Sequence, residues 1–238
     1  GDLAHWRYQT LDLAPHMTAG RNVVAAVVWN WGRYAPAAQI SNETAFLMQG
    51  DGSNESVINT PEGWKCIADE AYSPLDRHRP GYPAGVLAGA GETVDGTKYP
   101  WGWQTPAYDD SKWAAAVVTG NAMPYGVRND VDRWFLVPDP LPPQEDSPQR
   151  LARVVRAEGV EVPPGFASGK APLEVPANSK AVILLDNAVV TTAFPELTVS
   201  GGRGAKVEMV YSESLYKPVA GQQESRWPKG NRDETEAR

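Results

Sequence analysis

Turn-forming residues interrupt this chain about every ten residues, and this spacing limits the possible fold more than any other feature. The chain holds 22 glycines and 21 prolines among its 238 residues, and no long stretch keeps a helical period. Such frequent turns leave room for short strands but not for helices of ordinary length. The sequence therefore predicts an all-β protein.

The clearest strand of the first half is the apolar run Val23–Trp29, which follows a turn at Gly20. An unbroken run of β-branched and small residues between turn signals is typical of a strand buried on both faces. Trp29 and Trp64 both lie within predicted strands. We therefore expect both to belong to the hydrophobic core.

Other short apolar or alternating runs predict further strands. They cover residues 45–49, 64–68, 181–186, 189–194, 197–200 and 206–211. Residues 151–158 fit either a strand or a short helix. In the last strand Val207, Met209 and Tyr211 share one face, because side chains alternate along a strand. The glycine-rich segment 200–204 leads into this strand and lacks the ending of a phosphate-binding loop, so it predicts a hairpin turn.

A proline-rich segment divides the chain. Residues 138–147 contain four prolines and three acidic residues, a composition that gives an extended and semi-rigid linker. We therefore predict one domain over residues 1–137, a linker over 138–147 and a second domain over 148–238.

The overall composition excludes several function classes. The 29 acidic and 22 basic residues give a net charge of −7, which does not suit a nucleic-acid surface. Cys66 is the single cysteine, so the chain can form no internal disulfide. No apolar run approaches the roughly 20 residues that cross a bilayer. We expect no nucleic-acid partner and no membrane span.

The histidines do not indicate catalysis or a metal site. His5, His16 and His78 are far apart in the sequence and accompany turn or strand-edge residues. No serine lies in the Gly-x-Ser-x-Gly pattern of a hydrolase nucleophile, and no histidine pair has ligand spacing. We interpret all three as surface or turn residues and predict no metal ligand among them.

Carboxylate clusters are the remaining catalytic candidates, because glycosidic cleavage requires two carboxyl groups on opposite sides of a sugar. The clusters are Asp109/Asp110, Glu208/Glu213 and Asp233/Glu234/Glu236. Residues 108–113 predict a loop ending in one helical turn that a carboxylate caps, with Trp113 anchored in the core. The C-terminal cluster lies among arginines and fits a solvated face or an interdomain contact. We therefore predict no catalytic residue.

The segment 51–56 offers oxygen ligands at Asp51, Ser53 and Glu55, and Glu62 falls at the twelfth position of an EF-hand count. The sixth position is serine where that motif needs glycine, and strands are predicted where it needs helices. We interpret the segment as a solvated hairpin loop. No cofactor is predicted, and a bound calcium ion is the alternative.

Aromatic residues in loops are candidates for contact with carbohydrate. Flat aromatic faces stack on the apolar face of a sugar ring, while a few polar groups orient its hydroxyls. The candidates, each near glycine or proline, are Trp31, Tyr34, Trp101 and Trp103. Packing between loops is the alternative role for all four.

With these residues in view, the chain resembles the non-catalytic N-terminal part of bacterial α-L-rhamnosidases, which belong to a large inverting glycoside hydrolase family with an (α/α)6 barrel. The matching stretches, in the family's order, are GDLAHWRYQTLDLAP, AGRNVVAAVVWNWGRYAPAAQIS, PWGW, YDDSKW, LPPQED, SKAVILLDNAVVTTAFPELTVSGGRGAKVEMVYSESLY and KGNRDETEAR. The resemblance implies that 1–137 form a jelly-roll, galactose-binding-like β-sandwich without its first strands. It implies a second, incomplete β-sandwich over 148–238, truncated at its C-terminal end.

The resemblance also implies a function. Such a segment is an accessory region that braces the catalytic barrel of the same polypeptide and contacts rhamnose-containing glycans during polysaccharide degradation. The family's catalytic acid and base lie in the barrel, and no position of this chain matches them. A secreted or periplasmic location follows from a polysaccharide substrate. The alternatives are a stand-alone carbohydrate-binding module, a scaffold without ligand affinity, or the accessory region of a related hydrolase or polysaccharide lyase.

Overall fold

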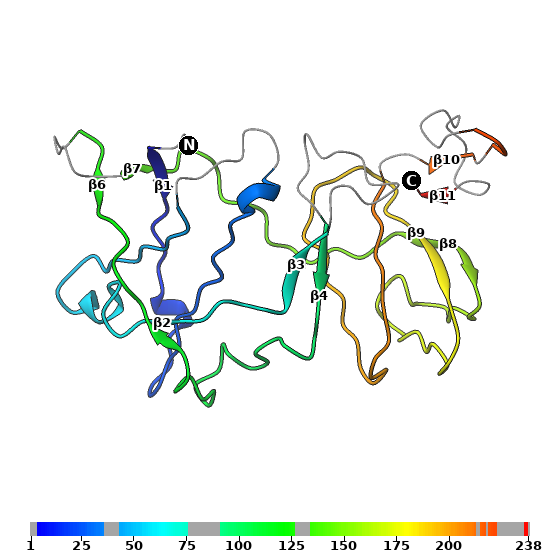
Figure 1. Cartoon of the computed structure of the whole chain (residues 1–238), viewed down its shortest axis with the longest axis horizontal. Helices are drawn as coiled ribbons and strands as arrows, with labels where there is room; N and C mark the ends of the chain where they lie inside the picture. Colours follow the sequence, from blue (N-terminus) through cyan, green and yellow to red (C-terminus); the bar gives the residue numbers. More distant parts are fainter. Residues whose placement is uncertain are drawn as a thin grey trace. The chain divides into compact units, whose positions relative to one another are not determined.

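The computed structural model describes residues 4–35, 43–75, 91–126, 134–212, 215–217, 219–222 and 236–237. Within these ranges the regular structure consists of short strands and single-turn 3-10 helices, and no α-helix is found (Figure 1). The strands are β1 (His5–Tyr8), β2 (Lys65–Cys66), β3 (Tyr72–Pro74), β4 (Glu92–Val94), β5 (Ala114–Ala115), β6 (Ala122–Pro124), β7 (Trp134–Pro138), β8 (Arg153–Glu158), β9 (Val182–Asp186), β10 (Leu215–Tyr216) and β11 (Glu236–Ala237). The 3-10 helices are η1 (Ala14–His16), η2 (Gly32–Tyr34) and η3 (Glu55–Ile58). The prediction of an all-β chain is confirmed for the class of secondary structure in these ranges.

The chain divides into two compact units, Gly1–Pro142 and Pro143–Arg238. The division falls inside the proline-rich segment 138–147. Each unit contains its own paired strands.

The largest sheet of the first unit has the order β1-β7-β6, and both strand pairs are parallel. Trp134, at the start of β7, is 3% exposed and lies 5.1 Å from the ring of Trp6 on β1. Asp139 follows β7 and donates its backbone amide to the carbonyl of Tyr8. These contacts tie the two ends of the first unit together.

Hydrogen bonds at Asp139 fix the chain as it leaves β7. Its carboxylate accepts hydrogen bonds from the Gln9 side chain, at 3.1 Å, and from the Leu141 amide, at 3.2 Å. Hydrogen bonding by Gln9 and Leu141, with the nearby charge of Arg7, lowers the pKa of Asp139. The ionised carboxylate therefore stabilises the start of the proline-rich segment.

Two small antiparallel pairs, β2–β5 and β3–β4, hold the other loops of the first unit. Ala71, just before β3, is buried, and its carbonyl accepts a hydrogen bond from the amide of Asp95. That bond extends the β3–β4 pairing by one step beyond the end of β4. As a result the loop that begins at Asp95 leaves the sheet from a fixed point.

The prediction of a doubly buried strand at Val23–Trp29 is wrong. None of the described residues pairs its backbone with this run, and Val27 and Trp29 are 77% and 55% exposed. A β-branched run favours an extended backbone, but burial on both faces requires neighbouring strands and covering layers. Trp29 is therefore not a core residue. Trp64 is half-buried, and its indole N–H donates to the carbonyl of Ile58 at 2.9 Å.

The second unit pairs β8 with β9 in antiparallel register, with an irregularity between Val154 and Arg156. The strand predicted at 181–186 is confirmed as β9, and residues 151–158 contain β8. The strand predicted at 64–68 is shortened to β2. The runs 45–49, 189–194, 197–200 and 206–211 are not strands, since the structure describes no ladder partner for them.

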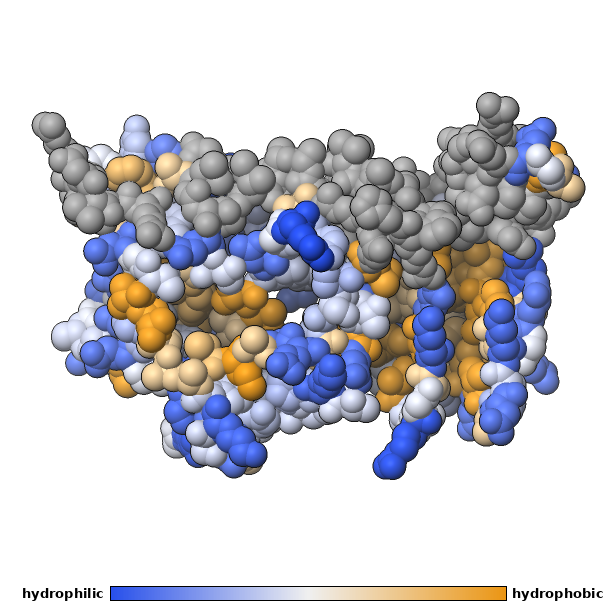
Figure 2. All heavy atoms as spheres, viewed as in Figure 1, coloured by the Kyte–Doolittle hydropathy of each residue, from blue (hydrophilic) through white to orange (hydrophobic). Residues whose placement is uncertain are grey.

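A long hairpin of extended chain, residues 189–212, follows β9 (yellow to orange in Figure 1). Its turn lies at the predicted place, where Ala205 donates its amide to the carbonyl of Gly202 at 2.8 Å. Gly201 has a φ of 68°, a conformation that favours glycine. The exposed large apolar residues of this hairpin are Val189, Val190, Phe194, Leu197, Val199, Val207, Met209, Val210 and Tyr211. Figure 2 shows apolar residues at the surface of both units.

Candidate functional site

The loop between β4 and β5, residues 95–113, is a series of tight turns. The bonds that close them run from the amides of Lys98, Trp103, Thr105, Tyr108 and Trp113 to the carbonyls of Asp95, Pro100, Gly102, Thr105 and Asp110, at 2.9–3.1 Å. Gly102 has a φ of 82°, which a side chain at this position would oppose. The loop backbone is therefore fixed by its own hydrogen bonds although most of it is exposed.

Trp101 is exposed and yet held in one orientation. The residue is 72% exposed, and its indole N–H donates to the carbonyl of Gly96 at 2.8 Å. The indole also meets the ring of Tyr99 edge-on, with the ring centres 4.8 Å apart. An anchored indole that remains largely exposed offers a flat apolar surface without a large ordering cost.

Trp103 is half-buried two residues further on. Its indole N–H donates to the hydroxyl of Tyr99 at 3.0 Å, and its ring stacks on Trp113 at 6.3 Å. Tyr108 meets Trp113 edge-on at 5.7 Å. We call this connected set (Tyr99, Trp101, Trp103, Tyr108 and Trp113) the aromatic platform.

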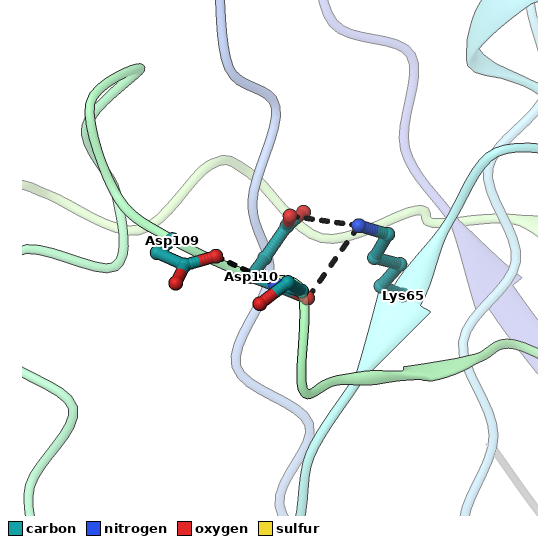
Figure 3. Close-up of polar contacts among 4 residues, drawn as sticks. Lys65, Asp109 and Asp110 are labelled. Atoms are coloured by element: carbon teal, nitrogen blue, oxygen red, sulfur yellow. Dashed lines mark hydrogen bonds and ion pairs between the residues drawn. The ribbon is translucent and has the colours of Figure 1, made fainter.

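The acidic pair beside the platform has structural partners (Figure 3). Asp110 forms an ion pair with Lys65 on β2, with 2.7 Å between Oδ1 and Nζ. Asp109 instead accepts a hydrogen bond from the amide of Ser111 at 3.0 Å. The carboxylate cap is thus present, but it caps a turn and not the expected helical turn. The two acids point to different partners and do not face a common space.

Local hydrogen bonding sets the charge state of the loop carboxylates. Hydrogen bonds from Ser111, through its side chain and its backbone, lower the pKa of Asp109. Hydrogen bonds from the side chain and amide of Thr97 lower the pKa of Asp95 in the same way. Each carboxylate is stabilised in its ionised form, because the donors favour the charged state.

Burial acts in the opposite direction on the strands that precede the loop. Desolvation raises the pKa of Glu92 on β4. Desolvation also raises the pKa of Tyr72 on β3, and Tyr99, Asp69 and Glu92 add to this effect. Tyr72 meets Tyr99 edge-on at 6.3 Å, so this strand pair contacts the platform directly.

The other two aromatic candidates lie elsewhere in the first unit. Trp31 directly precedes η2, is half-buried and lies 4.8 Å from the ring of Trp29. Tyr34 ends η2, and the guanidinium of Arg33 lies over its ring at 4.8 Å while donating to its hydroxyl. Among the four candidates, therefore, the structure groups Trp101 with Trp103. The ring contacts of Trp31 and Tyr34 that the structure describes are instead with Trp29 and Arg33.

Sequence reasoning missed Tyr99, which connects the two grouped tryptophans. The available signal was spacing, because Tyr99, Trp101 and Trp103 alternate within the sequence YPWGW. That alternation was ambiguous, since the intervening Pro100 and Gly102 exclude a regular strand. Only the turn geometry shows that the tyrosine hydroxyl reaches the second tryptophan.

The remaining candidates are placed as follows. His5 lies on β1 against Phe135 and Tyr125, and His16 lies in the exposed turn η1. His78, Glu213, Asp233 and Glu234 lie outside the described residues, and only the backbone of Glu236 is described. Glu208 is exposed in the hairpin.

The segment proposed as an alternative calcium site forms bends followed by η3. The hydroxyl of Ser56 donates to the carbonyl of Ser53 at 2.7 Å within this turn. Across the described ranges, no three His, Cys, Asp or Glu side chains come together as they would around a metal ion. Nor does any helix in those ranges have the length and hydropathy to cross a membrane.

Comparison with known proteins identifies the class of this all-β chain. The family model described as the alpha-L-rhamnosidase N-terminal domain matches residues 3–130, which is more than half of the chain. The chain belongs to this family, and the resemblance inferred from its motifs is confirmed.

A curated relative supports the same conclusion over a longer range. The alpha-L-rhamnosidase of Streptomyces avermitilis is 28% identical to the chain over 221 residues. The match covers 88% of this chain and 17% of the relative, so the chain spans only about a sixth of that protein's length. No solved structure matches the chain significantly.

Proposed function

We propose that this chain is the accessory, non-catalytic region of an α-L-rhamnosidase-like glycoside hydrolase that degrades rhamnose-containing glycans. The family match over 3–130 and the rhamnosidase name of the Streptomyces relative support this assignment. In this proposal the first unit is a jelly-roll, galactose-binding-like module and the second is an incomplete β-sandwich. The parent enzyme is secreted or periplasmic, where such glycans occur.

The catalytic step belongs to another part of the parent polypeptide. An inverting hydrolase needs one carboxyl group to protonate the leaving oxygen and another to activate water, with the sugar between them. Asp109 caps a turn and Asp110 pairs with Lys65, so neither is available for that arrangement. In the parent enzyme the acid and base are carried by the (α/α)6 barrel.

The observation that carries the functional proposal is the exposed but anchored ring of Trp101. The indole N–H groups of Trp101 and Trp103 are both used inside the loop, by Gly96 and Tyr99. The two tryptophans therefore offer a sugar their ring faces and not their N–H groups. We infer that the apolar C–H face of a glycan unit stacks on Trp101, with Trp103 beside it.

Calorimetry of the 238-residue chain with rhamnose-containing oligosaccharides tests this contact. Trp101→Ala should weaken binding at least about tenfold, which is a loss of about 1.4 kcal/mol. It should leave the free energy of unfolding within about 0.5 kcal/mol of the wild-type value, because the ring is exposed. Trp29→Ala is the matched control, since Trp29 is also exposed and lies outside the platform. Equal affinities for all three proteins would exclude the platform as the contact.

The hairpin 189–212 supports the bracing role. Nine of its large apolar residues are exposed, and apolar side chains that are exposed in such number are usually covered by another protein layer. We propose that the catalytic barrel of the same polypeptide covers this surface. A stand-alone carbohydrate-binding module is the alternative function, and it requires no such partner. Hydrogen exchange at residues 189–212, slowed when the barrel is added to the chain, would favour the bracing role.

A further inference from the structure

We propose that Tyr99 is the positioning residue of the aromatic platform, and this inference rests on the carbohydrate contact proposed above. Tyr99 is half-buried, whereas Trp101 is the most exposed ring of the set. In this proposal Trp101 forms the stacking surface, and Tyr99 orders it from behind. Its role is to hold the two tryptophan rings in a fixed mutual arrangement.

Tyr99 contacts both tryptophans through different atoms. Its hydroxyl oxygen accepts the indole N–H of Trp103 at 3.0 Å, while its ring meets Trp101 edge-on at 4.8 Å and 65°. Its backbone carbonyl also accepts the amide of Trp101 at 2.8 Å. Since the two side-chain contacts use separate parts of the tyrosine, they can be removed separately.

The frame behind Tyr99 explains why it can act as a fixed point. Its ring meets Tyr72 of β3 edge-on at 6.3 Å and 72°. The strand pair β3–β4 is anchored at buried Ala71, whose carbonyl accepts the amide of Asp95. The sheet thus supports Tyr99, and Tyr99 supports the exposed rings.

Losing the tyrosine hydroxyl should release one ring only. In Tyr99→Phe the half-buried Trp103 N–H loses its acceptor, but the ring contact with Trp101 remains. In Tyr99→Leu both contacts disappear. We therefore expect affinity for rhamnose-containing oligosaccharides to fall about fivefold in Tyr99→Phe and further in Tyr99→Leu. A purely structural role would lower stability in both variants without this graded loss of affinity.

Tyr108→Phe is the matched control. Tyr108 belongs to the same platform through its edge contact with Trp113 at 5.7 Å. Its hydroxyl has no hydrogen-bond partner within the described part of the chain. The same chemical change at this position should leave the Trp103 indole signal unchanged.

The experiment combines two readouts on the full 238-residue chain. The first is the indole 1H–15N resonance of Trp103, assigned with Trp103→Phe, and its rate of exchange with water. We expect this resonance to shift and to exchange about tenfold faster in Tyr99→Phe but not in Tyr108→Phe. The second readout is calorimetry with the oligosaccharides.

The two readouts separate the two proposals. An unchanged Trp103 resonance in Tyr99→Phe would overturn the positioning role whatever the sugar affinity. Wild-type affinity in both Tyr99 variants would overturn it too. If the wild-type chain binds no oligosaccharide, the proposed function fails, and the resonance then decides alone whether Tyr99 holds the rings. If Tyr99→Leu does not fold, Tyr99→Phe still gives both measurements.

Discussion

The aromatic platform and the hairpin 189–212 both expose large apolar side chains, but they differ in how those side chains are held. Trp101 is 72% exposed and is fixed by a hydrogen bond and a ring contact. Phe194 is 82% exposed, and the described residues supply no hydrogen-bonded ladder beside it. Exposure alone therefore does not define what an apolar residue can do.

We propose a different kind of partner for each of the two regions. A small rigid ligand such as a sugar gains most from a surface whose rings are already ordered, because little conformational entropy is then lost on binding. A broad, loosely held apolar surface instead suits a protein layer that buries many side chains at once. We assign the first role to the platform and the second to the hairpin.

The largest effect is expected at the hairpin. Phe194→Asp places a charge among the exposed apolar side chains, and the chain should lose at least about 30-fold in affinity for the separately produced catalytic barrel that we propose as its partner. Val27→Asp is the control, because Val27 is 77% exposed but lies in the first unit. Calorimetry measures both affinities. Equal losses of affinity from the two substitutions would show that the hairpin is not the surface that the catalytic barrel covers.

Two glycines provide a matched test of backbone strain. Gly102 in the platform loop and Gly201 in the hairpin turn have φ values of 82° and 68°, so alanine should cost about 1 kcal/mol of unfolding free energy at each. Chemical denaturation measures that cost. Oligosaccharide affinity should fall in Gly102→Ala and stay at the wild-type value in Gly201→Ala. A fall of oligosaccharide affinity in both variants would show that the affinity does not depend on the platform loop alone.

Acid should loosen the platform loop. The pKa of Asp95 and of Asp109 is lowered in the folded chain, so their stabilisation is complete above the unfolded aspartate pKa of about 3.9. It is lost as the pH falls below that value and through the folded pKa. Near-ultraviolet circular dichroism of the tryptophans should change over this acid range.

The acid response has its own control. Asp95→Asn keeps an oxygen that accepts from Thr97 but cannot ionise, and it should reduce the change in dichroism at low pH. An undiminished acid response in both Asp95→Asn and Asp109→Asn would show that other groups govern the loop.

The smallest effect concerns the ion pair beside the platform. Lys65 and Asp110 have side chains that are 40% and 49% exposed, so solvent screens their attraction. Lys65→Met should cost about 0.5 kcal/mol or less of unfolding free energy and leave sugar affinity unchanged. A loss of affinity comparable with that of Trp101→Ala would mean that this ion pair, and not Tyr99, orders the loop.

Local features of the chain could be predicted from its sequence. The density of glycine and proline correctly excluded long helices from the described ranges, and the turn after Ser200 follows from glycines that accept positive φ. Met209 and Tyr211, two of the three residues expected to share a face, are in contact, since the Tyr211 hydroxyl donates to the Met209 sulfur, although the strand predicted there is absent. These features depend on neighbours in the sequence, which is why the sequence contains them.

Features that depend on distant partners could not be predicted in the same way. An apolar run such as Val23–Trp29 indicates an extended backbone, but it carries no information about whether a strand lies beside it. The bond between Trp103 and the Tyr99 hydroxyl depends on the turn that Gly102 permits, so residue types alone do not reveal it. Trp101 and Trp103 could be proposed as sugar-contact residues from their loop setting. The role of Tyr99, which contacts both, required the structure.

Titration of the 238-residue chain with a rhamnose-containing oligosaccharide, followed both by calorimetry and by analysis of released sugar, distinguishes a binding region from a catalytic one. We predict saturable heat that Trp101→Ala removes, and an oligosaccharide recovered intact. Release of free rhamnose at an enzymatic rate, or heat that Trp101→Ala leaves unchanged, would contradict this prediction.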